Sequence, residues 1–132
     1  MPQAARTRKK PRARFKGVIR IEIMRIIWNI HTQTKSKEKA ERILFKVAEA
    51  LNVETGPIFV EKKGDGGCLC VFSHNLNSEN LEECVYESFV MAQRIGYSWS
   101  LNGNIEEEID LWSEKLQLPG IKAINAACNR NV

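Results

Sequence analysis

From Met24 onwards, strand-like and helix-like segments follow one another in an order that restricts the fold more than any other feature. Apolar residues occupy every second position from Met24 to Ile30, which is typical of a half-buried strand. The next segment has helical apolar spacing behind a possible N-cap, Ser36. The predicted elements are a strand at 24–31, a helix at 37–51, strands at 58–63 and 67–74, a helix at about 79–95, and strands at 97–101 and 121–128.

Turn signals connect several of these segments. Asp65-Gly66 lies between two strand-like runs and predicts a hairpin, and Asn102-Gly103-Asn104 predicts a second tight turn. The segment 105–116 is ambiguous, because its apolar residues fit either a helix face or strand alternation. We favour a strand there, since a strand directly after the turn would complete a hairpin.

The order of elements predicts an α+β fold in which an antiparallel sheet carries two helices on one face. This is the ferredoxin-like, split β-α-β arrangement with one or two extra strands at the C-terminal end. In it we expect the first and third strands to be adjacent and parallel, which would bring His31 and His74 to one rim. Cys70 would then lie near a histidine pair, although ordinary rim histidines remain the favoured interpretation.

The charge distribution divides the chain near Met24. Residues 1–23 hold eight of the 20 basic residues and one acid, so they carry +7, whereas residues 24–132 carry −3. Ile19, Ile21 and Ile23 are also out of phase with the alternation that begins at Met24. We therefore expect a single domain at 24–132 behind a basic, disordered extension at 1–23. That extension is either an artefact of start-site assignment or a nucleic-acid-binding arm.

The sequence contains no recognised catalytic, cofactor or metal motif. The four cysteines form no Cys-x-x-Cys pair and are expected to be core residues in a reducing cytoplasm. Charged residues interrupt the apolar stretch near the N-terminus, so no membrane span is expected. We accordingly expect a cytoplasmic protein that is not an enzyme and needs neither a metal nor a cofactor.

The clearest functional signal in the body is an acidic run that contains an aromatic residue. If 105–114 is a strand, Glu106, Glu108, Asp110 and Trp112 share one of its sides. Three acids beside an exposed tryptophan would steer a basic partner and anchor it. These four residues are the predicted partner-binding site. The alternative is that the acids form a solvated face.

Three segments together resemble small bacterial immunity proteins of the contact-dependent growth inhibition and polymorphic toxin systems. They are Met24-Arg-Ile-Ile-Trp-Asn-Ile30, Trp99-Ser-Leu-Asn-Gly103 with the acidic run that follows, and Leu118-Pro-Gly-Ile-Lys-Ala-Ile124. The resemblance implies a cytoplasmic inhibitor that binds a cognate toxin domain and covers its active site or substrate path. With a nuclease toxin, the acids would mimic a nucleic-acid backbone.

Two other functions remain open. One is nucleic-acid binding, either by the basic N-terminal arm or by a sheet face with Phe72 as a stacking aromatic. The other is a regulatory module of the same topology that binds a small ligand.

Overall fold

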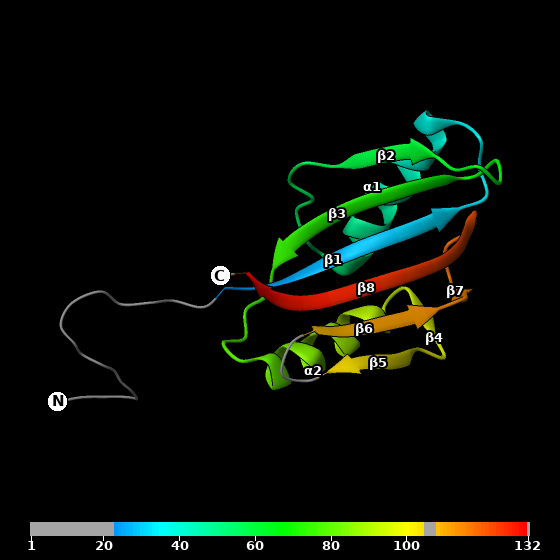
Figure 1. The fold of residues 1–132 in the computed structure, drawn as a ribbon. Coiled ribbons are helices and arrows are strands. Elements are labelled where there is room, and N and C mark those ends of the chain that lie inside the picture. The colour runs from blue at the N-terminus through cyan, green and yellow to red at the C-terminus, as the bar shows by residue number, and fades with distance from the viewer. Residues whose placement is uncertain (1–22, 105–107, 132) are drawn as a thin grey trace, which may run out of the picture.

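The computed structural model describes residues 23–104 and 108–131, which form two helices and eight strands (Figure 1). In chain order these are β1 (Ile23–Thr32), α1 (Lys37–Leu51), β2 (Phe59–Lys62), β3 (Cys68–Asn75), α2 (Leu81–Ala92), β4 (Gly96–Tyr97), β5 (Ser100–Asn104), β6 (Glu108–Ser113), β7 (Lys115–Leu116) and β8 (Ile121–Asn131).

Six strands form one sheet in the order β2-β3-β1-β8-β6-β5, and β4 and β7 form a small second sheet. Every neighbouring pair is antiparallel, so the predicted α+β class with an antiparallel sheet and two helices is confirmed. The predicted parallel pairing of the first and third strands is wrong. A tight hairpin reverses the chain between β2 and β3, so β3 runs against both β1 and β2.

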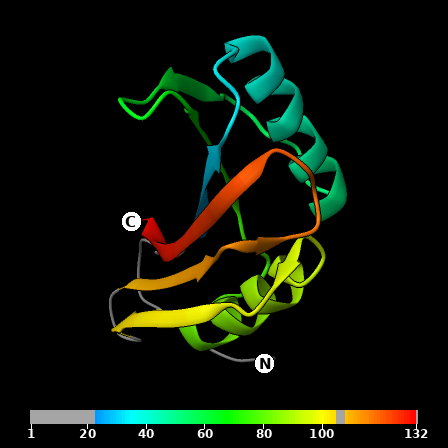
Figure 2. The same cartoon turned by 90° about the vertical axis from the view of Figure 1, so that its right-hand side faces the viewer.

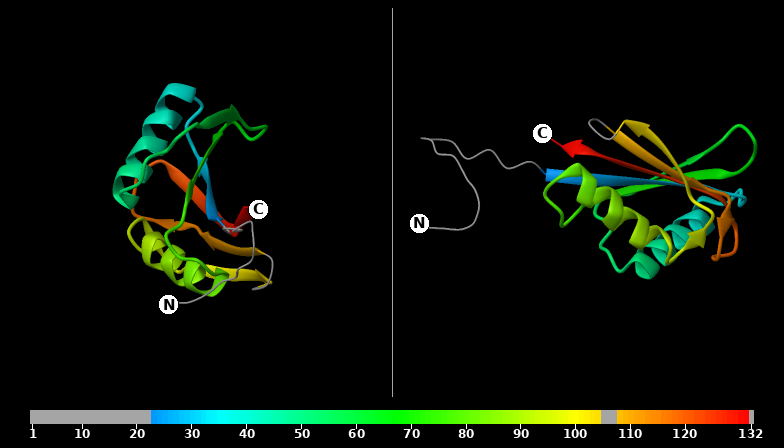
Figure 3. Two further views of the ribbon diagram at one scale, coloured as in Figure 1. Left: turned by 90° about the vertical axis from the view of Figure 1, so that its left-hand side faces the viewer. Right: turned by 90° about the horizontal axis from the view of Figure 1, so that it is seen from below.

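Both helices cover the same face of the large sheet, as the turned views show (Figures 2 and 3). The even-numbered residues of β1 point towards the helices, in the phase predicted from Met24, and Ile26, Trp28 and Ile30 are fully buried. They belong to one core cluster with residues of both helices, among them Leu44 and Cys84. Neither of the two described helices packs on the opposite face of the sheet.

Local signals account for the first helix and the first hairpin. The Ser36 side chain accepts a hydrogen bond from the Lys39 N–H at 3.3 Å, and Asn52 ends α1 in the left-handed conformation. In the hairpin, Gly66 has φ +95°, and the Asp65 carboxylate accepts the Gly67 N–H at 3.0 Å. These contacts confirm the helix at 37–51 and the turn at Asp65-Gly66.

Other boundaries differ from the prediction. Asn80 caps α2, which ends at Ala92 instead of continuing to 95. The expected strand at 97–101 is interrupted at Ser98, whose φ is +56°, so its two ends belong to different sheets. The expected turn at 102–104 is instead part of β5, where Gly103 pairs with Ile109. The segment that follows the gap in the described residues is strand β6, as favoured.

Candidate functional site

Strand β6 places the predicted site residues on the face of the sheet that the two helices leave uncovered. Ile109 and Leu111 are buried on the helix side, whereas Glu108, Asp110 and Trp112 alternate with them and point the other way. Glu106 lies outside the described residues. The structure therefore brings three of the four predicted residues to one side of one strand.

We call the side of the large sheet that faces away from α1 and α2 the open face. The strand registers place residues of the five neighbouring strands β2, β3, β1, β8 and β6 on it, because residues directly opposite one another share a face. Its described residues include Phe59, Ile27, Asn29, His31, Leu69, Val71, Ala123, Asn125, Ala127, Asp110 and Trp112. The centre is thus apolar or amide-bearing, and its most exposed aromatics are Phe59 and Trp112.

A ladder of amide side chains crosses the middle of the open face. The Asn29 side chain donates to the side-chain oxygen Oδ1 of Asn125 at 3.1 Å. Asn125 in turn donates to the Leu111 backbone oxygen at 3.3 Å and lies 3.5 Å from Asp110 Oδ1. The carboxylate of Asp110 therefore sits at the end of a hydrogen-bonded network that spans three strands.

Trp112 leans against His31 at one end of the open face. The indole side chain is 36% exposed, and the two ring centroids are 5.7 Å apart with their planes tilted by 55°. His31 Nδ1 lies 2.9 Å from Lys63 Nζ and must accept this hydrogen bond, because an ammonium group only donates. Burial, and then the charge of Lys63, lower the pKa of His31. A neutral imidazole therefore supports one side of the exposed tryptophan.

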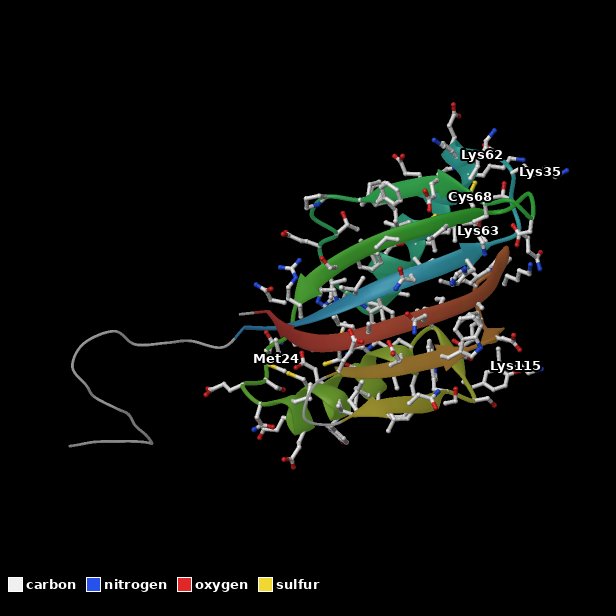
Figure 4. The ribbon with its side chains drawn as sticks, viewed as in Figure 1. Met24, Lys35, Lys62, Lys63, Cys68 and Lys115 are labelled. Atoms are coloured by element: carbon white, nitrogen blue, oxygen red, sulfur yellow. The ribbon has the colours of Figure 1, made fainter. Side chains whose placement is uncertain are left out.

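Positive charge gathers beyond this aromatic pair, at the β2–β3 hairpin. Asp65 lies 3.7 Å from Lys63 and 3.3 Å from Lys122, so one carboxylate faces two ammonium groups. Lys35 and Lys62 extend from the same end of the molecule (Figure 4). The open face thus runs from Glu108 and Asp110, past Trp112, to a lysine-rich rim.

His74 belongs to a different environment. It lies opposite Ile26, whereas His31 lies opposite Leu69, so the antiparallel pairing separates the two histidines along the strands and the expected common rim is wrong. His74 Nε2 accepts the Trp28 indole N–H at 3.0 Å, and Nδ1 lies 3.1 Å from the Asn75 carbonyl. Burial lowers the pKa of His74. These contacts give this histidine a structural role.

Cys70, expected near the two histidines, and Phe72, considered as a stacking aromatic, both lie in the core and not on the open face. Burial raises the pKa of the Cys70 thiol to about 11, and the thiol donates to the Ala40 carbonyl beneath α1. Phe72 is 1% exposed within the core, so the expectation that it could stack on bases is wrong. Among the residues that the structure describes, no cluster of three metal-ligating side chains occurs.

Sequence patterns did not identify Asn29, His31 or Asn125 as parts of the open face. The signal that marks Asn29 and His31 is their phase, because both alternate with the buried residues of β1, and Asn125 is placed by its register opposite Asn29.

No helix in the described part of the chain is long and apolar enough to cross a membrane. No protein-family model matches the sequence, and comparisons with curated proteins and with solved structures found no similar chain.

Proposed function

We propose that this chain is a cytoplasmic immunity protein that binds a cognate toxin domain with the open face of its sheet and blocks the toxin's active site or substrate path. The supporting observation is the arrangement on β6, where Trp112 is exposed on the same side of the strand as the carboxylates of Glu108 and Asp110. The protein acts by occupancy in this proposal and catalyses no reaction.

The chemistry of the open face favours a protein partner. Binding energy in interfaces concentrates in a few aromatic anchors surrounded by weaker contacts, and Trp112 held against His31 is such an anchor. The carboxylates beside it would steer a basic surface towards the tryptophan. A nuclease toxin presents a basic substrate groove, so we propose a nuclease domain as the partner.

We also propose that the fold is ferredoxin-like, with β1, α1, β2, β3, α2 and β8 as the split β-α-β core. The strand order β2-β3-β1-β8 supports this, because β3 lies between β1 and β2, which α1 connects. The segments β4 to β7 are then an insertion that widens the sheet and supplies the site strand.

The test is a co-expression rescue with the C-terminal domain of the protein encoded immediately upstream. The full chain should restore growth and elute with that domain as a one-to-one complex. Trp112→Ala and the double variant Glu108→Lys/Asp110→Lys should each weaken binding by at least about 30-fold, the loss typical of an interface hot spot. The control Glu41→Lys/Glu49→Lys makes the same charge change on the solvent side of α1 and should bind like the wild type.

Unchanged affinity in the β6 variants would contradict the assignment of the site. A toxic domain that is neither bound nor neutralised would contradict the function. Oligonucleotide binding by the full chain without a toxin complex would favour the alternative, in which the basic residues of 1–23 bind nucleic acid.

A further inference from the structure

A cavity of about 900 Å³ lies at the opposite end of β1 and β3 from His31 and Trp112. It opens between the end of β3, the segment that leads from α1 to β2, and α2. Leu51, Val53 and Met91 contribute apolar surface to it. Figure 4 marks this end of the sheet by Met24, the neighbour of Arg25, and the other end by Lys63. Its volume is in the range of small-ligand and peptide sites.

The backbone of β3 is unpaired along this cavity. β2 pairs only with residues 68–71, so residues 72–75 have β1 on one side and no described strand on the other. Along an antiparallel pair of strands, residue pairs that exchange backbone hydrogen bonds alternate with pairs that do not. The Lys63 N–H donates to the Gly67 carbonyl, so these two residues form a hydrogen-bonded pair. Every second residue of β3 after Gly67 directs its backbone N–H and C=O groups to the side on which β2 lies. Ser73 and Asn75 are two of these residues, and they lie beyond the end of the pairing with β2. The residue in register with Ser73 is Pro57, which has no N–H to offer.

Two arginines line the same cavity without a carboxylate partner among the described residues. Arg25 donates to Asn75 Oδ1 at 3.2 Å and to Ser73 Oγ at 2.5 Å, and Arg94 donates to the Leu51 carbonyl at 3.0 Å. All three acceptors are neutral. The ion pairs among the described residues belong to Asp65, at the other end of the sheet.

Two acids, Glu54 and Glu87, also line the cavity, and neither forms an ion pair with Arg25 or Arg94 among the described residues. The Glu87 carboxylate accepts the N–H groups of Asn77 and Ser78, each at 3.1 Å, and the Ser78 hydroxyl at 2.9 Å. The Glu87 carboxylate therefore caps the turn before α2, and its hydrogen bonds go to that turn and not to an arginine. Each of the two guanidinium groups makes only hydrogen bonds to neutral acceptors, so a carboxylate ligand would offer it a stronger, charge-assisted bond.

We propose that this cavity binds an extended peptide segment that carries a carboxylate. The segment adds a short strand to the edge of β3 at Ser73 and Asn75, as peptides do when they extend an exposed sheet edge. Its carboxylate pairs with Arg25 and Arg94, and an apolar side chain on the inward side contacts Leu51 and Met91. The inference goes beyond the proposed function, because it uses different residues from the β6 site.

The experiment selects a random octapeptide display library on the immobilised full chain and then measures the affinity of synthetic versions of the enriched peptides. We expect enrichment of sequences that combine an acidic residue with apolar residues at alternate positions. Arg25→Gln and Arg94→Gln should each weaken binding by at least about tenfold, because each removes a charge-assisted contact. Lys46→Gln, on the exposed side of α1, is the charge-matched control and should bind normally.

A matched pair at Ser73 tests strand addition itself. Ser73→Ala and Ser73→Pro both remove the hydroxyl that Arg25 contacts, but only proline removes the outward N–H. The alanine variant should retain binding and the proline variant should lose it. Hydrogen exchange of the wild type should show peptide-dependent protection at Ser73 and Asn75, a readout that remains informative if the proline variant does not fold.

Three results would overturn the inference. The first is the absence of any enriched peptide family. The second is enriched peptides whose affinity is unaffected by Arg25→Gln and Arg94→Gln and which do not protect Ser73. The third is binding of inorganic phosphate or acetate with the same arginine dependence while peptides do not bind, which would make this a small-anion site. The β6 variant Trp112→Ala, which changes no charge and lies beside His31 at the other end of the sheet, should leave peptide affinity unchanged, so failure of one proposal does not imply failure of the other.

Discussion

The two histidines are both held neutral by their neighbours, although only His31 borders the open face. Lys63 donates to His31, and Trp28 donates to His74, so protonating either ring would turn an acceptor nitrogen into a donor and break its bond. Burial is the main reason that both pKa values lie below the ordinary value of 6.5. Protonation of these two residues therefore opposes folding.

This coupling predicts a loss of stability in mild acid. Both folded-state pKa values lie below 6.5, the ordinary value. Between those folded-state values and pH 6.5, the unfolded chain therefore binds more protons than the folded chain. The histidine contribution is complete above pH 6.5 and is lost as the pH falls from there through the folded-state pKa values. Thermal unfolding followed by circular dichroism should give a lower Tm at about pH 5.5 than at about pH 7.5.

The double variant His31→Gln/His74→Gln is the control, and its Tm should vary much less over the same interval. Asp65 does not account for the effect, because its own pKa lies below the ordinary value of 3.8 as a result of the Gly67 N–H and Lys122. A wild-type Tm that is equal at both pH values would contradict the assignment.

At the scale of single elements, the β2–β3 hairpin shows how close backbone packing shapes the lysine-rich rim. A Cβ on Gly67 would overlap the Thr32 carbonyl oxygen at the end of β1, so no side chain fits there. Gly64, in the same turn, has an ordinary φ, and a Cβ added to it would meet no atom within 4 Å.

We predict that Gly67→Ala destabilises the protein by about 1–3 kcal/mol, because the backbone of β1 or of the hairpin must move. Gly64→Ala should change the free energy of unfolding by no more than about 0.5 kcal/mol. Urea unfolding measures both variants. Equal stabilities would mean that the hairpin can shift away from Thr32 at no cost.

The same elements show what sequence patterns can predict. The Ser36 cap, helix α1 and the Asp65-Gly66 turn depend on residues within a few positions of one another, and all three were predicted correctly. The Gly103 segment was assigned wrongly, because a glycine with φ +120° inside a paired strand has the same local signature as a turn. The direction of β3 relative to β1 was also assigned wrongly, although the predicted Asp65-Gly66 hairpin, which reverses the chain between β2 and β3, already implies that β3 runs against β1.

The candidate sites show the difference between features that depend on nearby residues and features that depend on distant ones. Glu108, Asp110 and Trp112 were predictable as one group because strand alternation is local. The cavity was not, because its wall combines residues from β1, the ends of α1 and β3, and α2. The pairing of His31 with Trp112 was likewise beyond prediction, since it depends on β8 lying between their two strands.

At the scale of the whole molecule, Trp112 and the cavity lie towards opposite ends of a sheet that a single core supports, whereas Glu108 is in register with Arg25 through Asn129. Each helix covers one half of that sheet, with α1 packed on β3 and α2 packed on β8. Trp28 and Ile30 of β1, at the centre, belong to the same buried cluster as residues of both helices. We therefore expect the two halves to unfold together.

The buried thiols on the two halves provide a test of this cooperativity. Cys70 lies beneath α1 and Cys84 lies within α2, and burial raises their pKa values to about 11 and about 12. Neither thiol should react with an alkylating reagent in the folded chain, so labelling requires opening. If the core opens as one unit, mass spectrometry should find both cysteines labelled with the same protection, and that protection should fall with urea at the slope of global unfolding. Faster labelling of Cys84 would instead show that α2 opens on its own. The wall of the cavity that Met91 and Arg94 provide would then be mobile independently of the strand that carries Trp112.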